Sequence, residues 1–151
     1  MQDKILHAVQ EADAKVIGLQ VPEGLKSKAL EWVQDIEKQG AQSYVFAGPC
    51  YGACDLKDRE AEELGCDLLI HVGHSDIGIK TKIPTVYIEY QSDIDISKIT
   101  EQAGKEITEN KIGLVTTVQH VHKLDEVKEI LEKTGKEVII AKSDSRSKYP
   151  G

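Results

Sequence analysis

Six short apolar stretches, rich in β-branched residues, recur along the chain. They show no clean alternation of apolar and polar positions, which is typical of strands that are buried on both faces. The pattern therefore predicts a sheet that is covered on both sides. The predicted strands are Lys15–Gln20, Ser43–Ala47, Asp67–Val72, Pro84–Ile88, Lys111–Val118 and Lys136–Ala141.

Between these strands, apolar residues recur every three or four positions, which predicts amphipathic helices. The clearest stripe is followed by Gly40, a suitable helix end. A shorter helix is expected to begin near Asp55, a good N-cap residue, and to stop at Gly65. The apolar positions are Ile5, Val9 and Ala12; Leu25, Ala29, Trp32, Val33 and Ile36; Ala61 and Leu64; Ile99, Ala103 and Ile107; and Leu124, Val127 and Leu131.

The alternation of strands and helices predicts an α/β fold with a parallel sheet flanked by helices. Residues 1–95 supply four strands and are expected to form a first domain. Residues 96–151 supply a linker helix and the opening β-α-β of a second, similar domain, which is too short to be complete. We interpret the chain as the front part of a longer protein; the alternative is a complete protein with a frayed tail.

Charge and cysteine content narrow the class of protein. The 151 residues include 26 acidic and 19 basic side chains, and a net charge of −7 argues against nucleic acid as the main partner. No apolar stretch approaches the roughly 18 residues that span a bilayer, and no signal-peptide core follows Met1. Three cysteines do not suggest a disulfide framework, so we expect a reduced, cytoplasmic protein.

Residues capable of chemistry gather after the predicted strands. Ligands of open parallel sheets bind outside the carboxyl ends of the strands, so one edge of the sheet is the expected site. The opposite edge carries ordinary turn residues. The residues at the expected site are Cys50 and Cys54 in a Gly-rich turn, His71 and His74 on either side of Gly73, and Gln119 and His120 at the end of the fifth strand.

The three cysteines are expected to differ in their roles. Cys54 is expected just before a helix, where backbone amides favour the thiolate that binds metal or attacks a substrate; burial as a small apolar residue is equally open. Cys50 precedes it by four residues, and without a second pair this is no structural zinc pattern. A complete metal site within this chain is not expected. Cys66 is expected in the core.

The histidines also leave alternatives open. His74 could bind a metal, orient an anion or cap a helix, whereas His71 still lies in the strand and is expected to be structural. Gln119 and His120 are expected to face a ligand. The chain has no P-loop lysine pattern, no G-x-G-x-x-G and no nucleophile elbow, which argues against a kinase, a classical dinucleotide enzyme and a serine hydrolase.

Four motifs together resemble the archaeal and eukaryotic diphthamide synthase family, in the family's order and spacing and over essentially the whole chain. Any one of them alone would be a weak signal. The motifs are Gln20-Val21-Pro22-Glu23-Gly24-Leu25, Tyr51-Gly52-Ala53-Cys54-Asp55, His71-Val72-Gly73-His74-Ser75 and Thr117-Val118-Gln119-His120.

The resemblance implies three similar α/β domains around a central cavity, each giving one cysteine to a [4Fe–4S] cluster whose fourth iron binds S-adenosylmethionine. It implies cleavage that yields a 3-amino-3-carboxypropyl radical, which adds to the imidazole of one histidine of elongation factor 2. It further implies that archaeal members act as homodimers.

Carried over to this chain, the resemblance makes Cys54 the first cluster cysteine. It makes His74 with Ser75, and Gln119 with His120, the residues that face S-adenosylmethionine.

Three departures from the family pattern qualify this picture. Asp76 stands where many relatives have a cysteine, a change that should not remove a ligand. Cys50 stands where relatives often have a small polar residue and adds a competing thiol. In the family, a stretch like Tyr149-Pro150-Gly151 comes shortly before the second cluster cysteine. The chain therefore carries one of three expected ligands, and we expect it to be inactive alone.

Two other functions remain open. One is an enzyme similar to quinolinate synthase, which has a comparable arrangement of three domains and three cysteines but fits the motifs less well. The other is a non-catalytic ligand-binding module or supporting subunit of α/β fold.

Overall fold

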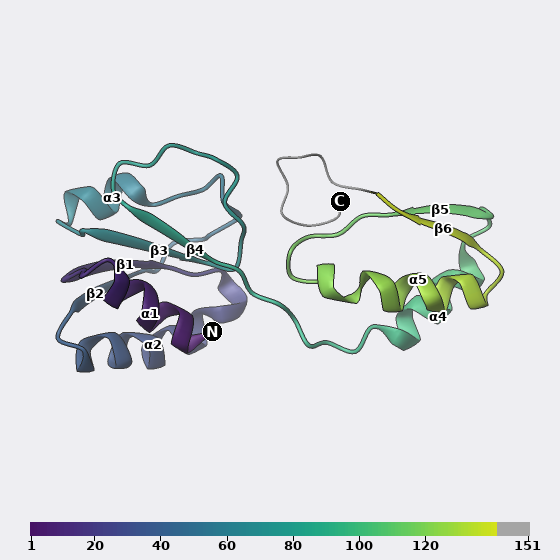
Figure 1. The fold of residues 1–151 in the computed structure, drawn as a ribbon, viewed down its shortest axis with the longest axis horizontal. Coiled ribbons are helices and arrows are strands. Elements are labelled where there is room, and N and C mark those ends of the chain that lie inside the picture. The colour runs from purple at the N-terminus through teal and green to yellow at the C-terminus, as the bar shows by residue number, and fades with distance from the viewer. Residues whose placement is uncertain (142–151) are drawn as a thin grey trace. The chain divides into compact units, whose positions relative to one another are not determined.

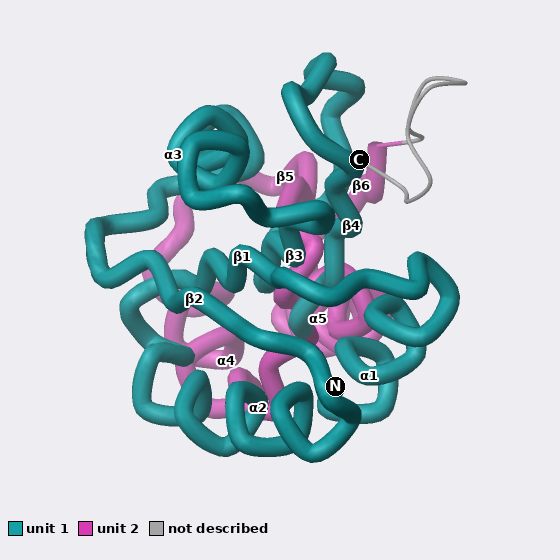
Figure 2. Tube along the Cα trace, turned by 90° about the vertical axis from the view of Figure 1, so that its left-hand side faces the viewer, with its two compact units in different colours: residues 1–90 teal, residues 91–151 magenta. Residues whose placement is uncertain are grey.

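The computed structural model describes residues 1–141 and divides the chain into two compact units, Met1–Tyr90 and Gln91–Gly151 (Figure 2). The boundary predicted from the sequence falls after residue 95, within a few residues of this division. The segment Tyr149-Pro150-Gly151, which supports the expected position of a further cysteine, lies outside the described residues. Within those residues, no helix is both long enough and apolar enough to cross a membrane.

The first unit is built on a four-stranded parallel sheet with strand order β2-β1-β3-β4 (Figure 1). Its strands are β1 (Val16–Gln20), β2 (Gln42–Phe46), β3 (Leu68–Val72) and β4 (Thr85–Ile88). The two central strands are almost wholly buried, which explains their continuous apolar sequence. The predicted α/β fold with a four-stranded parallel sheet flanked by helices is confirmed.

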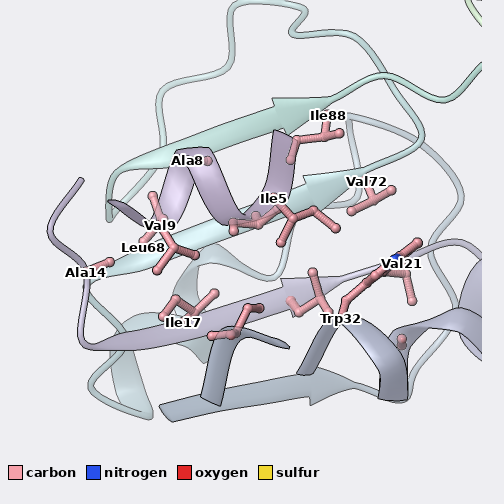
Figure 3. Packing of buried hydrophobic residues seen from close by; sticks show 14 of the residues in the cluster. Ile5, Ala8, Val9, Ala14, Ile17, Val21, Trp32, Leu68, Val72 and Ile88 are labelled. Carbon is pink, nitrogen blue, oxygen red and sulfur yellow. The ribbon is translucent and has the colours of Figure 1, made fainter. Parts of the chain in front are cut away.

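Two helices cover one face of this sheet, α1 (Gln2–Glu11) and α2 (Lys26–Lys38), the latter preceded by the short helix η1 (Glu23–Leu25) (Figure 1). Ile5 and Val9 of α1 and Trp32 of α2 form one cluster with strand residues (Figure 3). Burying a large apolar side chain contributes about 1.5–3 kcal/mol, so this layer holds the sheet. The strand residues shown there are Ile17, Leu68, Val72 and Ile88.

A single short helix, α3 (Asp58–Glu63), covers the other face (Figure 1). Ala61 packs there with Leu69 and with Cys66, which is buried as the sequence predicts. Gly18 of β1 lets this layer approach, because a Cβ there would lie 3.0 Å from the Phe46 ring and 3.3 Å from the Ala61 Cβ.

The predicted start of this helix is wrong. The helix α3 begins at Asp58 with Lys57 as its N-cap residue, and Asp55 does not cap it. The Asp55 carboxylate instead accepts a hydrogen bond from the Tyr51 backbone N–H and pairs with the Lys57 ammonium group. Cys54 therefore lies in an irregular turn rather than at a helix N-terminus.

The second unit contains the parallel strands β5 (Lys111–Leu114) and β6 (Glu137–Ile140) and the helices α4 (Ser97–Glu106) and α5 (Leu124–Lys133). The short helix η2 (Val121–Lys123) leads into α5. The fifth strand ends four residues before the predicted Val118, because Leu114 and Ile140 form the last pair of the ladder. Val115, one residue later, is 76% exposed.

The buried side of α4 also differs from the predicted stripe. Ile99 is 68% exposed, whereas Thr100 and Gly104 are buried. A Cβ on Gly104 would lie 2.7 Å from the Thr134 hydroxyl, so the residue just after α5 approaches the bare backbone of α4. The predicted stripe overlooked this contact because glycine and threonine carry little weight in an apolar pattern.

Candidate functional site at the carboxyl ends of β1 and β3

The loop after β2 is held by a side chain of α2 and by a backbone hydrogen bond of its own. At its start, the Lys26 ammonium group donates to the carbonyl oxygens of Ala47 (2.6 Å) and Gly48 (3.0 Å). Further along, the Asp55 backbone N–H donates to the Gly52 carbonyl at 3.0 Å, which closes a tight turn around Cys54. These bonds give the cysteine-bearing turn a defined shape without a helix.

The three thiols lie in different environments. Cys54 is exposed, whereas Cys50 and Cys66 are buried. Burial, reinforced by the negative charge of Asp55, raises the pKa of the Cys50 thiol. Burial and Asp67 do the same for the pKa of Cys66. Cys54 is thus the thiol that a solvent-borne metal or cluster can reach without a change of structure.

Gln20, the last residue of β1, connects this turn to the sheet. Its side chain is 1% exposed. Its amide nitrogen donates to the Asp55 carbonyl oxygen, and its amide oxygen accepts the Lys57 backbone N–H at 3.1 Å. The same oxygen lies 3.1 Å from His71 Nδ1, the residue beside it in β3. The turn with Cys54 and the histidine pair are therefore fixed by one buried amide.

This network determines the tautomers of both histidines. A carbonyl oxygen only accepts and a backbone N–H only donates, so Asp55 and Lys57 fix which end of the Gln20 amide is oxygen. His71 Nδ1 must then carry the proton, which leaves a lone pair on Nε2. Because His71 Nε2 lies 3.0 Å from His74 Nδ1, His74 donates that hydrogen bond and keeps a lone pair on its own Nε2.

Both imidazoles are neutral at pH 7. Burial, and then the neighbouring His74, lower the pKa of His71 to about 4, against a smaller opposing effect of Asp55. Burial also lowers the pKa of His74. The Tyr87 ring of β4 also lies against His71, with ring centroids 5.5 Å apart. A neutral imidazole is the form that binds metal or accepts a proton.

Gly73 allows His74 to fold back onto His71. Its φ of +103° lies in a region that side-chain-bearing residues rarely adopt. A Cβ there would also lie 3.0 Å from Cγ of Pro22. The proline of one sequence motif thus packs against the glycine of another.

One group of metal-capable residues occurs here in the described part of the chain. Cys50, His71 and His74 each offer one ligand atom, and these atoms lie within 4.8 Å of one another. Cys54 does not belong to this group. The predicted residue Ser75 follows His74 and is half-buried.

The remaining predicted residues belong to the second unit. Gln119 and His120 lie in a turn before η2 and do not end the fifth strand, which corrects the prediction. The Ser92 backbone N–H donates to the Gln119 carbonyl at 2.9 Å. His120 Nδ1 is buried and has no hydrogen-bond partner within residues 1–141.

Sequence reasoning missed the part played by Gln20. The available signal was a polar residue at the end of an otherwise apolar strand, together with a histidine near the end of another apolar strand. His71 was expected to be structural, and it is buried in β3, but it also connects Gln20 to His74.

Comparisons with known proteins identify relatives over nearly the whole chain. The family model of diphthamide synthesis proteins matches residues 21–151. The 2-(3-amino-3-carboxypropyl)histidine synthase of Pyrococcus horikoshii is 37% identical over 99% of this chain and 44% of its own length. Subunit 1 of the enzyme of the same name from Neurospora crassa is 36% identical over 91% of this chain and 31% of its own length.

Solved structures agree. Crystal structures of Dph2 from Pyrococcus horikoshii, one of them with a 4Fe-4S cluster, match with a TM-score of 0.84 and 37% identity. They match over 99% of this chain and 45% of theirs, so the chain spans less than half the length of these relatives. The resemblance seen in the four sequence motifs is confirmed, and the chain belongs to the diphthamide synthesis protein family.

Proposed function

We propose that this chain is the amino-terminal part of a [4Fe–4S] enzyme that transfers a 3-amino-3-carboxypropyl group from S-adenosylmethionine to a histidine of elongation factor 2. The observation that carries the proposal is the exposed Cys54 thiol in a turn fixed to the end of the sheet. It is supported by a match over 99% of the chain to a protein whose crystal structure holds a 4Fe-4S cluster.

The donor set of this chain fits part of such a cluster. Iron–sulfur clusters are held by cysteine thiolates, and Cys54 is exposed while Cys50 and Cys66 are buried. The chain can therefore offer one accessible thiolate, and the other ligands have to come from outside its 151 residues. On this proposal the chain by itself assembles no stable cluster and has no activity.

The residues of the chain would take distinct roles. Cys54 would hold one iron, and Gln20 would keep its turn in place through Asp55 and Lys57. When bound, the cluster supplies the electron that cleaves S-adenosylmethionine.

Other side chains would bind that cofactor. The Nε2 lone pair of His74 suits its ammonium group, and the hydroxyl of Ser75 can donate to its carboxylate. The family resemblance also implies contacts from Gln119 and His120, and His120 Nδ1 is buried without a hydrogen-bond partner within the described residues.

A supporting-subunit function is the second candidate, because a relative is named as subunit 1 of its enzyme.

For the partners, we propose that the full-length protein forms a homodimer and binds elongation factor 2, as the family resemblance implies. Three free cysteines suit a reducing compartment such as the cytoplasm.

The test is transfer activity of the full-length protein encoded by the gene, purified without oxygen. Labelled S-adenosylmethionine and purified archaeal elongation factor 2 are supplied with a reductant, and methylthioadenosine and label on the factor are measured. We expect both products from the unmodified protein and from Cys66→Ala, whose buried thiol faces the α3 layer. Cys54→Ser should form neither. Activity that survives Cys54→Ser would contradict the proposal, and a chain active only beside a second protein would favour the supporting subunit.

A further inference from the structure

The buried thiol of Cys50 and the imidazole of His71 have no part in the function proposed above, and they form a group with His74, the residue assigned there to S-adenosylmethionine. Their ligand atoms lie within 4.8 Å of one another. We propose that these three residues bind one divalent transition-metal ion of the zinc type, at a site separate from Cys54. The proposal does not depend on the function proposed above.

The donor set favours this class of metal. One thiolate and two neutral imidazoles suit Zn²⁺ and Co²⁺, whereas Mg²⁺ and Ca²⁺ prefer oxygen ligands. Three protein ligands leave a fourth position for water or a small ligand, as in catalytic zinc sites.

The geometry is close to what a tetrahedral site requires. With usual Zn–S and Zn–N bond lengths, the ligand atoms lie about 3.5 Å apart. His71 Nε2 and His74 Nδ1 are 3.0 Å apart, and one ligand atom from each of the three residues can be chosen so that no two are more than 4.8 Å apart. His71 is fixed by Gln20, so closing the site requires a shift of roughly 1 Å in the half-buried His74 or the Cys50 turn.

A second observation points independently to a metal. Metal-bound histidines usually donate their other ring N–H to an oxygen that fixes the tautomer. Gln20 does this for His71: its oxygen accepts from Nδ1 and leaves the Nε2 lone pair directed at His74. Gln20 is itself held by Asp55 and Lys57, so this ligand is oriented before any metal arrives.

Binding would change the protonation of the site in a defined way. The Cys50 thiol would release its proton to solvent when its sulfur binds the ion. His74 would lose the Nδ1 proton that it gives to His71 and, remaining neutral, would carry it on Nε2. The outer edge of His74 would therefore change from an acceptor to a donor, and the Asp55 carboxylate near Cys50 would offset part of the cation's charge.

The test is titration of the reduced, metal-free 151-residue chain with Co²⁺ under anaerobic conditions. We expect one equivalent to bind, with a thiolate-to-cobalt charge-transfer band and visible ligand-field bands, and Zn²⁺ to displace it. Cys50→Ala should abolish the charge-transfer band, and His74→Ala should weaken binding at least tenfold. Cys54→Ala, which changes the neighbouring exposed thiol, should leave both band and affinity unchanged. Circular dichroism checks that each variant is folded.

A second measurement needs no variant. Zn²⁺ should slow the alkylation of Cys50 by iodoacetamide, read by mass spectrometry, with Cys54 and Cys66 of the same molecules as internal references. A charge-transfer band that survives Cys50→Ala, or that disappears only in Cys54→Ala, would overturn the proposal. Failure to bind one equivalent of Co²⁺, or equal protection of Cys50 and Cys54, would also overturn it. None of these results would affect the assignment of Cys54, which is tested separately by the iron content of the full-length protein.

Discussion

The amide oxygen of Gln20 accepts the Nδ1 proton of His71 across 3.1 Å, between the last residue of β1 and its neighbour in β3. The rest of the Gln20 amide holds the backbone of the turn that carries Cys54. Through this one side chain, the exposed thiol of Cys54 and the pair of His71 and His74 have a common support.

Removing that support should destabilise the fold. Gln20→Ala leaves the His71 Nδ1 proton, the Lys57 N–H and the Asp55 carbonyl without their partner, and each buried unsatisfied group costs about 1–3 kcal/mol. Because water can reach part of the turn, we expect the free energy of unfolding in urea to fall by roughly 2–4 kcal/mol. The matched control is Gln10→Ala on the exposed side of α1, which should change it by less than about 0.5 kcal/mol. Equal losses of unfolding free energy in the two variants would contradict the hydrogen-bond network around Gln20.

The metal-free chain should lose stability in mild acid. The pKa of His71 is lowered from 6.5 to about 4 in the folded state, so between these pH values the unfolded chain binds the extra proton. The stabilisation is complete above pH 6.5, falls as the pH drops toward 4 and changes no further below it. The loss is about 3 kcal/mol, and His74, whose pKa is also lowered, adds to it. Proton NMR of the histidine rings measures this directly, and a His71 resonance that titrates near pH 6.5 would refute it.

Gly73 should not tolerate a side chain. Gly73→Ala places a methyl group 3.0 Å from Pro22 at a φ of +103°, so we expect a loss of roughly 1–3 kcal/mol in unfolding free energy. Gly48→Ala is the matched control, because a Cβ there meets nothing within 4 Å and φ is not in the left-handed region. Thermal unfolding of both variants measures the difference, and comparable midpoints would show that the turn adapts.

Lys26 should control the order of the loop after β2. Lys26→Met removes the donor to the Ala47 and Gly48 carbonyls, so amide hydrogen exchange across residues 47–55 should become faster. Lys28→Met, on an exposed position of the same helix, provides the comparison. Exchange that accelerates equally in both variants would mean that the loop is held by other contacts.

Much of the fold was predictable because strands that are buried on both faces have continuously apolar sequences. The continuous apolar residues of β1 and β3 and the glycine after α2 predicted the bounds of those elements within a residue or two. Two misplaced boundaries share another cause. Asp55 looked like a cap but uses its carboxylate within its own turn, and the apolar residues after Leu114 pair with no strand within residues 1–141. Neither feature can be recognised from the neighbouring residues in the sequence.

The position of the candidate site was predictable from the sequence, but its hydrogen bonds were not. Topology alone brings Cys54, His71 and His74 to the same edge of the sheet. The hydrogen bonds through Gln20 depend on the register between β1 and β3, which pairs Gln20 with His71. The burial of Cys50 and the exposure of Cys54, four residues apart in one turn, likewise arise only from packing.

If Cys54 is a ligand of iron, its replacement must lower the iron and sulfide content of the full-length protein purified without oxygen. We expect a [4Fe–4S] signal in electron paramagnetic resonance after reduction of the unmodified protein and of Cys66→Ala, and its loss in Cys54→Ser. A cluster that remains intact in Cys54→Ser would show that Cys54 is not a ligand of iron.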